Sequence, residues 1–325
     1  MSVKKTRIET VLEEEDKYLS ESDEKILKEI NYSRKQMELD LEQLKEWLKD
    51  QHHLPECRLT EKDNFLTNYL TGCKGSLETV KRKLDAYYTL RGKSEVYSNR
   101  DPLNEEYRKI CDLCYQNILP KLTKNGEILF TSKLATSEIP PNAFCNAMKR
   151  MINIGDIALR LAPINKPLIY IVDYDKFTRA HAAIYTPGLI RDTIHIAQNV
   201  FPSRIKKIIL FNVPSFFDVI VNSLIKPFLS QKLKNRIIVT SGGCEELHKY
   251  VDKEVLPKDW QGDYHLSLKE VNDAWNEYET TYRDWFINEL SEQTNESKRI
   301  DTGSKCLIED SYFGVQGTLK KLAID

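Results

Sequence analysis

Apolar side chains near the N-terminus recur every three or four positions, which is the period of one helical face. The first such series is Ile30, Met37, Leu41, Leu44 and Leu48. Ser22 can cap the helix that carries this series, and Thr60 and Ser76 can cap the next two helices. One side of the last helix holds Val80, Leu84, Tyr87 and Tyr88. The pattern therefore predicts an all-helical N-terminal region.

The pattern changes from about Glu127 onwards, where short β-rich runs alternate with helical stretches. The runs occupy residues 128–130, 168–172, 208–211 and 237–240. Alternation of this kind favours a largely parallel sheet with crossover helices. Residues 272–290 then predict an aromatic-rich helix, and the remaining tail is expected to be irregular. The predicted fold class is α/β, with the helical region first.

Residues 201–240 combine an apolar helix with a cluster of positive charge. The apolar positions that share one face of this helix are Phe217, Ile220, Val221, Leu224, Ile225 and Phe228. Pro227 is expected to start a second short helix that brings Lys232 and Arg236 together. The segment holds seven Lys or Arg and one acid, although the formal net charge of the chain is only −1. Such segregation indicates either a surface that meets phosphate beside an apolar space, or a core helix followed by a solvated basic turn.

Composition narrows the class of protein. With 325 residues, of which 41% are hydrophobic and 30% charged, the chain can bury a large core. No segment approaches the roughly 18 to 20 uninterrupted apolar residues that cross a bilayer, and the N-terminus is rich in Lys and Glu where a signal peptide is apolar. The cysteines number seven, and an odd, scattered set suits reduced thiols. We therefore expect a cytoplasmic protein.

The candidate catalytic and metal-binding motifs are incomplete. Residues 241–243 read Ser-Gly-Gly after a β-rich run, but neither GxxxxGKS/T nor GxGxxG is present. Cys244 and His248 are four residues apart, which suits a thiol and its base but is also a common chance spacing. Cys111 and Cys114 lack a second pair for zinc and are expected on a helix surface. We expect no enzyme activity, no cofactor and no metal site.

Several blocks of the chain, taken together, resemble the CRAL-TRIO lipid-binding family. The blocks are LKEWL at 44–48, LDAYYTLR at 84–91, IYIVDYDKF at 169–177, YTPGLIRD at 185–192, and the run from FPSR at 201 to KLKNRI at 232–237. The resemblance covers roughly residues 41–262. Three further segments resemble the insect alpha-tocopherol transfer protein-like branch, namely GCKGSLE at 72–78, NRDP at 99–102 and FGVQGTLKKLAID at 313–325.

This resemblance implies a domain organisation. A helical N-terminal domain is expected at residues 1–95, a CRAL-TRIO lipid-binding domain at 96–265, and a C-terminal helix and tail at 266–325. The parallel sheet and its helices are expected to enclose an apolar pocket, and the helix at 215–226 is expected to be a mobile gate over it.

The resemblance also implies which side chains contact a ligand. The expected pocket residues are Met148, Met151, Ile152, Gly155, Ile171, Ile194, Ile196, Ala197, Phe201, Phe211, Phe216, Phe217, Ile220, Val221, Leu224, Ile225 and Phe228. Each of them fits ordinary core packing equally well. His195, in the expected wall helix, is either a hydrogen-bond partner for a polar ligand group or a satisfied structural histidine.

The basic residues are expected to bind a phosphoinositide head group, as the matching positions do in tocopherol-transfer relatives. These positions are Arg204, Lys206, Lys232 and Arg236. Relatives often add arginines from a FLRAR-like segment, but this chain has Thr71 and Cys73 at those positions and only Lys74 nearby. Strong selectivity among head groups is therefore not expected.

The sequence as a whole predicts a cytoplasmic, non-enzymatic carrier of a small hydrophobic ligand that associates transiently with membranes. Tocopherol, a retinoid, a carotenoid or other isoprenoid, and a phospholipid all satisfy an apolar pocket. The alternative is a lipid-responsive sensor or interaction protein without transfer activity. Nucleic acid is not an expected partner, because aliphatic side chains rather than stacking aromatics lie between the basic residues.

Overall fold

The computed structural model describes residues 16–55, 63–161, 164–289 and 291–299. Its centre is a five-stranded sheet in the order β1-β2-β3-β4-β5. The strands are β1 (Cys114–Ile118), β2 (Ile128–Leu134), β3 (Pro167–Asp173), β4 (Arg204–Phe211) and β5 (Ile237–Val239). Strands β2 to β5 are parallel to one another, and β1 is antiparallel to β2. The predicted α/β class with a largely parallel sheet is confirmed.

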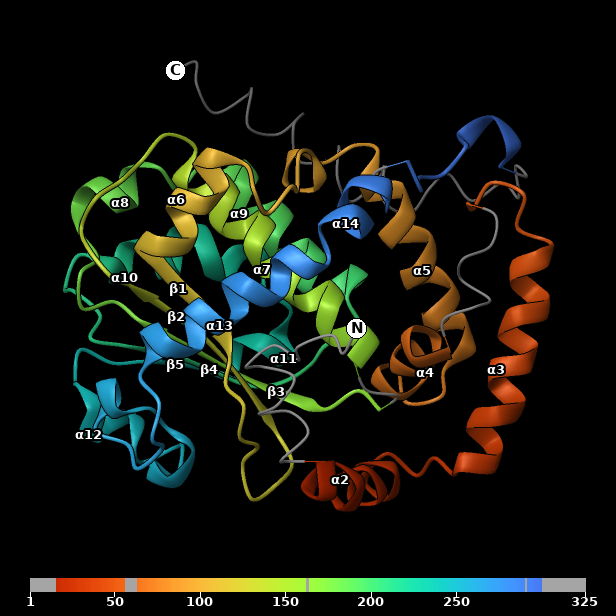
Figure 1. Ribbon diagram of the computed structural model, residues 1–325, viewed down its shortest axis with the longest axis horizontal. Coiled ribbons are helices and arrows are strands. Elements are labelled where there is room, and N and C mark those ends of the chain that lie inside the picture. Colours follow the sequence, from red (N-terminus) through yellow and green to blue (C-terminus); the bar gives the residue numbers. More distant parts are fainter. Residues whose placement is uncertain (1–15, 56–62, 162–163, 290, 300–325) are drawn as a thin grey trace, which may run out of the picture.

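Helices surround the sheet, with α3, α4 and α5 on one side of the molecule and α8, α10 and α12 on the other (Figure 1). The α-helices are α2 (Asp16–Glu29), α3 (Arg34–Lys49), α4 (Asp63–Gly72), α5 (Leu77–Arg91), α6 (Glu105–Leu113), α7 (Ala143–Leu161), α8 (Arg179–Ala183), α9 (Pro187–His195), α10 (Phe217–Ile220), α11 (Gln231–Lys234), α12 (Cys244–Leu247), α13 (Leu268–Thr281) and α14 (Arg283–Glu289). Two π-helical segments are η2 (Ile196–Val200) and η3 (Val221–Ile225), and the 3-10 segments are η1 (Glu95–Tyr97), η4 (Lys226–Phe228), η5 (Lys253–Val255), η6 (Lys258–Trp260) and η7 (Glu296–Lys298). Among the described residues, no helix has both the length and the apolar character of a membrane span.

Residues 16–49 form two helices where the sequence predicts one helix capped by Ser22. Ser22 lies inside α2, so its predicted capping role is wrong. The chain turns between α2 and α3 because Asn31 has a left-handed backbone with φ of 53°, and Ser33 then caps α3. Ser76 caps α5 as predicted. Thr60 lies outside the described residues.

Two later elements also differ from the sequence prediction. Strand β1 is not predicted, and it follows α6 directly. Cys111 is buried in α6 and Cys114 is buried at the start of β1, so the predicted position of this pair on a helix surface is wrong. The aromatic-rich helix begins at Leu268 with Ser267 as its cap, and it is interrupted at Tyr282 between α13 and α14.

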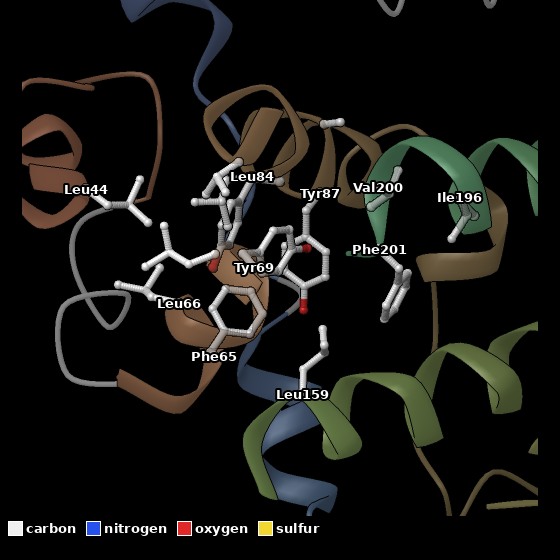
Figure 2. Packing of buried hydrophobic residues seen from close by; sticks show 14 of the residues in the cluster. Leu44, Phe65, Leu66, Tyr69, Leu84, Tyr87, Leu159, Ile196, Val200 and Phe201 are labelled. Atoms are coloured by element: carbon white, nitrogen blue, oxygen red, sulfur yellow. The ribbon is translucent and has the colours of Figure 1, made fainter. Parts of the chain in front are cut away.

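The core of the N-terminal helices continues into the helices that flank the sheet (Figure 2). Tyr87 on α5 makes edge-on contacts with Tyr69 on α4 and with Phe201 after η2, at ring-centroid distances of 6.3 and 6.2 Å. Leu159 on α7 belongs to the same buried cluster. The N-terminal helices therefore help to fix the position of η2.

Gly72, the last residue of α4, packs directly against Pro202. A Cβ atom at position 72 would lie 2.2 Å from the Pro202 carbonyl oxygen. We expect Gly72→Ala to lower the free energy of unfolding by about 1–3 kcal/mol, because backbone must shift to make room. Gly188→Ala is the matched control, since nothing lies within 4 Å of its added Cβ. Chemical denaturation measures both variants, and equal midpoints would contradict the close approach.

Candidate functional site

An apolar cavity of about 360 Å³ lies between one face of the sheet and the helices α7, α8 and α9 with η2. The sheet contributes alternate residues, among them Phe130, Tyr170 and Leu210. Helix α7 contributes Met148 and Met151, whose side chains adapt to irregular shapes. Because the lining is mostly apolar, water inside would find few hydrogen-bond partners, and the space suits an apolar guest.

Part of the predicted pocket set lines this cavity. These residues are Met148, Met151, Ile152, Gly155, Ile194, Ile196, Ala197, Phe201 and Ile225. They come from α7, α9, η2 with the residue after it, and the end of η3. The structure thus brings together side chains that are up to 77 positions apart, as Met148 and Ile225 are. Their contact with a ligand stays a prediction.

Ile171 and Phe211 lie on the other face of the sheet. Both are fully buried, and the ring of Phe211 lies 5.5 Å from that of Trp260, centroid to centroid. Successive side chains of a strand point to opposite faces, so Tyr170 and Leu210 reach the cavity and their neighbours do not. The predicted pocket positions Ile171 and Phe211 are therefore core positions outside the lining of the cavity.

The predicted gate helix is a series of short turns, α10, η3 and η4. Its residues Phe217, Ile220 and Val221 are buried against the segment that follows β3. The ring of Phe217 lies 4.4 Å from that of Tyr174 and 5.3 Å from that of Phe177. Of the six predicted residues on the apolar face of this segment, Ile225 alone lines the cavity. The other predicted residues outside the cavity lining are Phe216, Leu224 and Phe228.

The segment after the gate contributes two wall residues that the sequence did not indicate. Leu229 and Leu233 both line the cavity. Pro227 lies within η4, and α11 begins only at Gln231, so the prediction that Pro227 starts this helix is wrong. Leu229 separates the two helical turns because its backbone is extended.

The cavity wall also includes a buried histidine for which the sequence offered no role. His181 on α8 is 5% exposed, and its Nδ1 accepts a hydrogen bond from the amide of Thr178 at 3.2 Å. Burial lowers the pKa of His181, so the ring is neutral and carries its proton on Nε2. Within the part of the chain that the structure describes, this buried Nε2 has no hydrogen-bond partner. His195, at the end of α9, lies outside the lining.

A buried lysine ties the wall segment η2 to α5. The Lys83 Nζ atom donates to the carbonyl oxygens of Gln198 at 2.7 Å and Phe201 at 2.6 Å. Carbonyl groups at a helix end lack partners within the helix, so the ammonium group satisfies them. Burial lowers the pKa of Lys83 to about 8. Lys83 therefore holds in place the stretch of wall that includes Ala197.

The predicted phosphoinositide residues gather beside the cavity. Arg204 and Lys206 lie on β4, Lys232 lies on α11, and Arg236 follows α11. Burial lowers the pKa of Lys232, and the positive charges of Arg236, Lys74, Arg204 and Lys206 lower it further. These five cations, Lys74, Arg204, Lys206, Lys232 and Arg236, form one group, the basic cluster. Lys74 thus reaches the cluster from the N-terminal helices.

Cys244 on α12 and His248, which follows this helix, lack the features of an activated thiol and its base. Burial raises the pKa of the Cys244 thiol, which keeps it protonated. His248 Nε2 lies 2.8 Å from the carbonyl oxygen of Trp260 and donates to it, so the ring is turned towards backbone. Across residues 16–55, 63–161, 164–289 and 291–299, no group of three or more His, Cys, Asp and Glu side chains is arranged to hold a metal ion.

These features define a class of α/β protein in which a sheet and its helices enclose an apolar cavity beside a cluster of cations. Residues 115–262 match the family model of the CRAL/TRIO domain. This part of the chain is thus a CRAL/TRIO domain, as the resemblance predicts. Residues 33–107 match the model of a Pinta-like UBA domain. The predicted domain boundaries at residues 95 and 265 stay predictions.

Individual relatives support the same assignment. The chain is 30% identical to alpha-tocopherol transfer protein-like of Homo sapiens over 124 residues, which are 38% of this chain and 35% of the relative. It is 31% identical to clavesin-2 of Rattus norvegicus over 94 residues, 29% of this chain and 28% of the relative. These alignments thus span about a third of each relative. The crystal structure of Sfh5 shares the fold, with a TM-score of 0.51 and 14% identity over 79% of this chain and 99% of that one.

Proposed function

We propose that this protein is a carrier that binds a small hydrophobic ligand in the cavity and exchanges it at membranes containing phosphoinositides. The observation that carries the proposal is the apolar cavity of about 360 Å³ within the CRAL/TRIO domain. Its volume falls in the range of about 300–1,000 Å³ that small-molecule sites occupy. Binding and release need no catalytic group, and we propose no enzyme activity.

Burial of the ligand supplies the affinity. A guest that buries roughly 400 Å² of apolar surface gains about 10 kcal/mol before the cost of association, at about 25 cal/mol per Å². Native mass spectrometry of the purified protein, with extraction of the lipid that copurifies, tests the proposal and identifies the ligand. A protein that carries no hydrophobic molecule and takes none up from vesicles would contradict it.

We propose residues 215–226 as the gate. Ile225 from this segment lines the cavity, whereas Asn222 and Ser223 are exposed on its outer side. The segment consists of short α and π turns instead of one regular helix, and such a unit opens at lower free energy than a continuous helix. Opening would separate Phe217 from Tyr174 and Phe177.

The basic cluster is proposed to receive the head group. Charge reversal by Lys232→Glu is expected to weaken binding to phosphoinositide vesicles by about tenfold, since each Lys near an anionic surface contributes about 1 kcal/mol. Ligand uptake is expected to be unchanged, because the Lys232 side chain lies outside the cavity lining. Vesicle sedimentation and uptake of a fluorescent lipid measure the two properties.

The matched control for this prediction is Lys258→Glu. Lys258 is exposed on η6 and lies outside the basic cluster, but the variant changes net charge by the same amount. Equal vesicle binding by the two variants would contradict a specific role for the cluster. Transfer of ligand between two vesicle populations distinguishes a carrier from a sensor, which would bind ligand without moving it. Cytoplasmic localisation stays a prediction.

A further inference from the structure

We propose that Glu29, the last residue of α2, is an internal latch on the basic cluster, which a phosphate group has to displace. This inference rests on the proposed function, because it concerns the same cations. It adds a regulatory contact from a helix that lies outside both family-model matches, since these begin at residues 33 and 115.

The carboxylate of Glu29 forms ion pairs with two cations of the basic cluster. Glu29 Oε1 lies 2.6 Å from Lys206 Nζ and 3.2 Å from Arg204 Nη2. The hydrogen bond from Lys206 holds the pKa of Glu29 below its ordinary value, and the charges of Arg204 and Lys206 add to this effect. The carboxylate is therefore ionised at neutral pH and occupies the position that a phosphate oxygen would take.

Arg204 shows that this site is incomplete without a larger anion. The Arg204 side chain is only 6% exposed, so its charge needs acceptors. Glu29 bonds to Nη2, but Nη1 is buried without a hydrogen-bond partner among the described residues. A phosphate monoester offers three acceptor oxygens and a charge of about −1.5 to −2, so it can serve more of these donors than one carboxylate.

The balance of charge also favours replacement of the Glu29 carboxylate by a phosphate group. The carboxylate of Glu29 faces the basic cluster, in which burial and mutual repulsion already lower the pKa of Lys232. A more highly charged anion relieves more of this repulsion than Glu29 does. The Glu29 side chain is 45% exposed, so it can turn into solvent when the anion arrives.

The end of α2 and the residue that follows it are anchored independently of Glu29. Ile26, Leu27 and Ile30 are all buried in the N-terminal core. Asp23 makes a further buried ion pair with Lys166. The latch can therefore open by rotation of one side chain while the helix stays in place.

The test compares Glu29→Gln with Glu24→Gln on the same helix. Glu24 pairs with the exposed Arg34 at 2.6 Å, so the control removes a carboxylate of equal charge from a pair outside the cluster. Binding is measured on phosphatidylcholine vesicles with and without phosphatidylinositol bisphosphate. Glu29→Gln is expected to bind the phosphoinositide vesicles about threefold more tightly than the wild type, and Glu24→Gln equally tightly, as partly exposed ion pairs of this kind permit.

The outcomes separate the two proposals. Phosphoinositide-dependent binding that Glu29→Gln leaves unchanged or weakens would overturn the latch alone, because Glu29 would then be neutral or would position the cations for the phosphate. Binding that never depends on the phosphoinositide, in the wild type or either variant, would overturn the head-group proposal and the latch with it. Unchanged uptake of a fluorescent lipid by both variants verifies that they are folded.

Discussion

Replacing Asp156 by alanine is expected to lower the free energy of unfolding by about 3–5 kcal/mol, because the change leaves a buried arginine without its counter-charge. Asp156 on α7 is fully buried. Its Oδ2 accepts from Arg100 Nη2 at 2.5 Å and its Oδ1 from the Tyr87 hydroxyl at 2.7 Å. The variant therefore leaves two buried donors, the Arg100 guanidinium and the Tyr87 hydroxyl, without this acceptor.

The same network joins three parts of the chain. Tyr87 also accepts from Arg91 on α5, and Arg91 pairs with Glu289 on α14 at 2.8 Å. Glu289 pairs in turn with Arg160 on α7 at 3.0 Å. N-terminal helix, cavity wall and C-terminal helix are thus connected by buried charges, and the loss of Asp156 affects all three.

The control for this prediction is Asp273→Ala, which removes an exposed i,i+4 pair with Lys269. Its effect is expected to be no more than about 0.5 kcal/mol. Urea denaturation followed by circular dichroism measures both variants. A loss for Asp156→Ala that is no larger than the control would mean that the buried network contributes little.

The contribution of Asp156 also has a defined pH range. Burial on its own would raise the pKa of Asp156, but the charges of Arg100, Arg160 and Arg91 outweigh it and lower that pKa below the ordinary value. The stabilisation is therefore complete at neutral pH. It is lost as the pH falls below about 3.9, the ordinary value in an unfolded chain, towards the lower value of the folded state.

Ala197→Trp is expected to reduce ligand affinity by about 100-fold, equivalent to about 2.8 kcal/mol, while the protein stays folded. Ala197 lies on η2 and lines the cavity, so an indole at this position fills space that the ligand needs. Existing empty volume takes up the added side chain, which limits the strain of overpacking. The measurement is the amount of lipid that copurifies, together with uptake of a fluorescent lipid.

Ala183→Trp is the control, because Ala183 is exposed on α8 and lies outside the cavity lining. It adds the same side chain without filling the cavity, and its uptake is expected to match the wild type. If Ala197→Trp bound lipid as well as this control does, the ligand would have to occupy another part of the protein.

The regular spacing of apolar residues along the chain made much of the fold predictable. The three-and-four spacing around Leu84 and Tyr87 predicts α5, and the β-rich runs around Ile169 and Ile209 predict the two central parallel strands. Strand β1 escapes prediction because it carries the polar residues Gln116 and Asn117, both of which the fold buries. A polar strand of five residues has no apolar period to detect.

The candidate site was only partly predictable. The period of apolar residues shows which side chains share one face of a strand or helix, but not what that face packs against. For Ile171 and Phe211, strand alternation shows that they differ from Tyr170 and Leu210, but not which set meets the cavity. For the gate, the apolar face is correct, but its packing on Tyr174 becomes visible only in three dimensions. His181 could have been suspected only from its place after β3, since its spacing is uninformative.

The sequence by itself determined the α/β class, the CRAL/TRIO domain, the apolar segment around Phe217 and the concentration of positive charge after residue 201, because each depends on local composition and spacing. Only the tertiary structure decided where the cavity lies, that Lys74 joins the basic cluster, and that Glu29 faces it. These features depend on residues far apart in the chain. Their contacts arise from how the helices pack on the sheet, which no local pattern encodes.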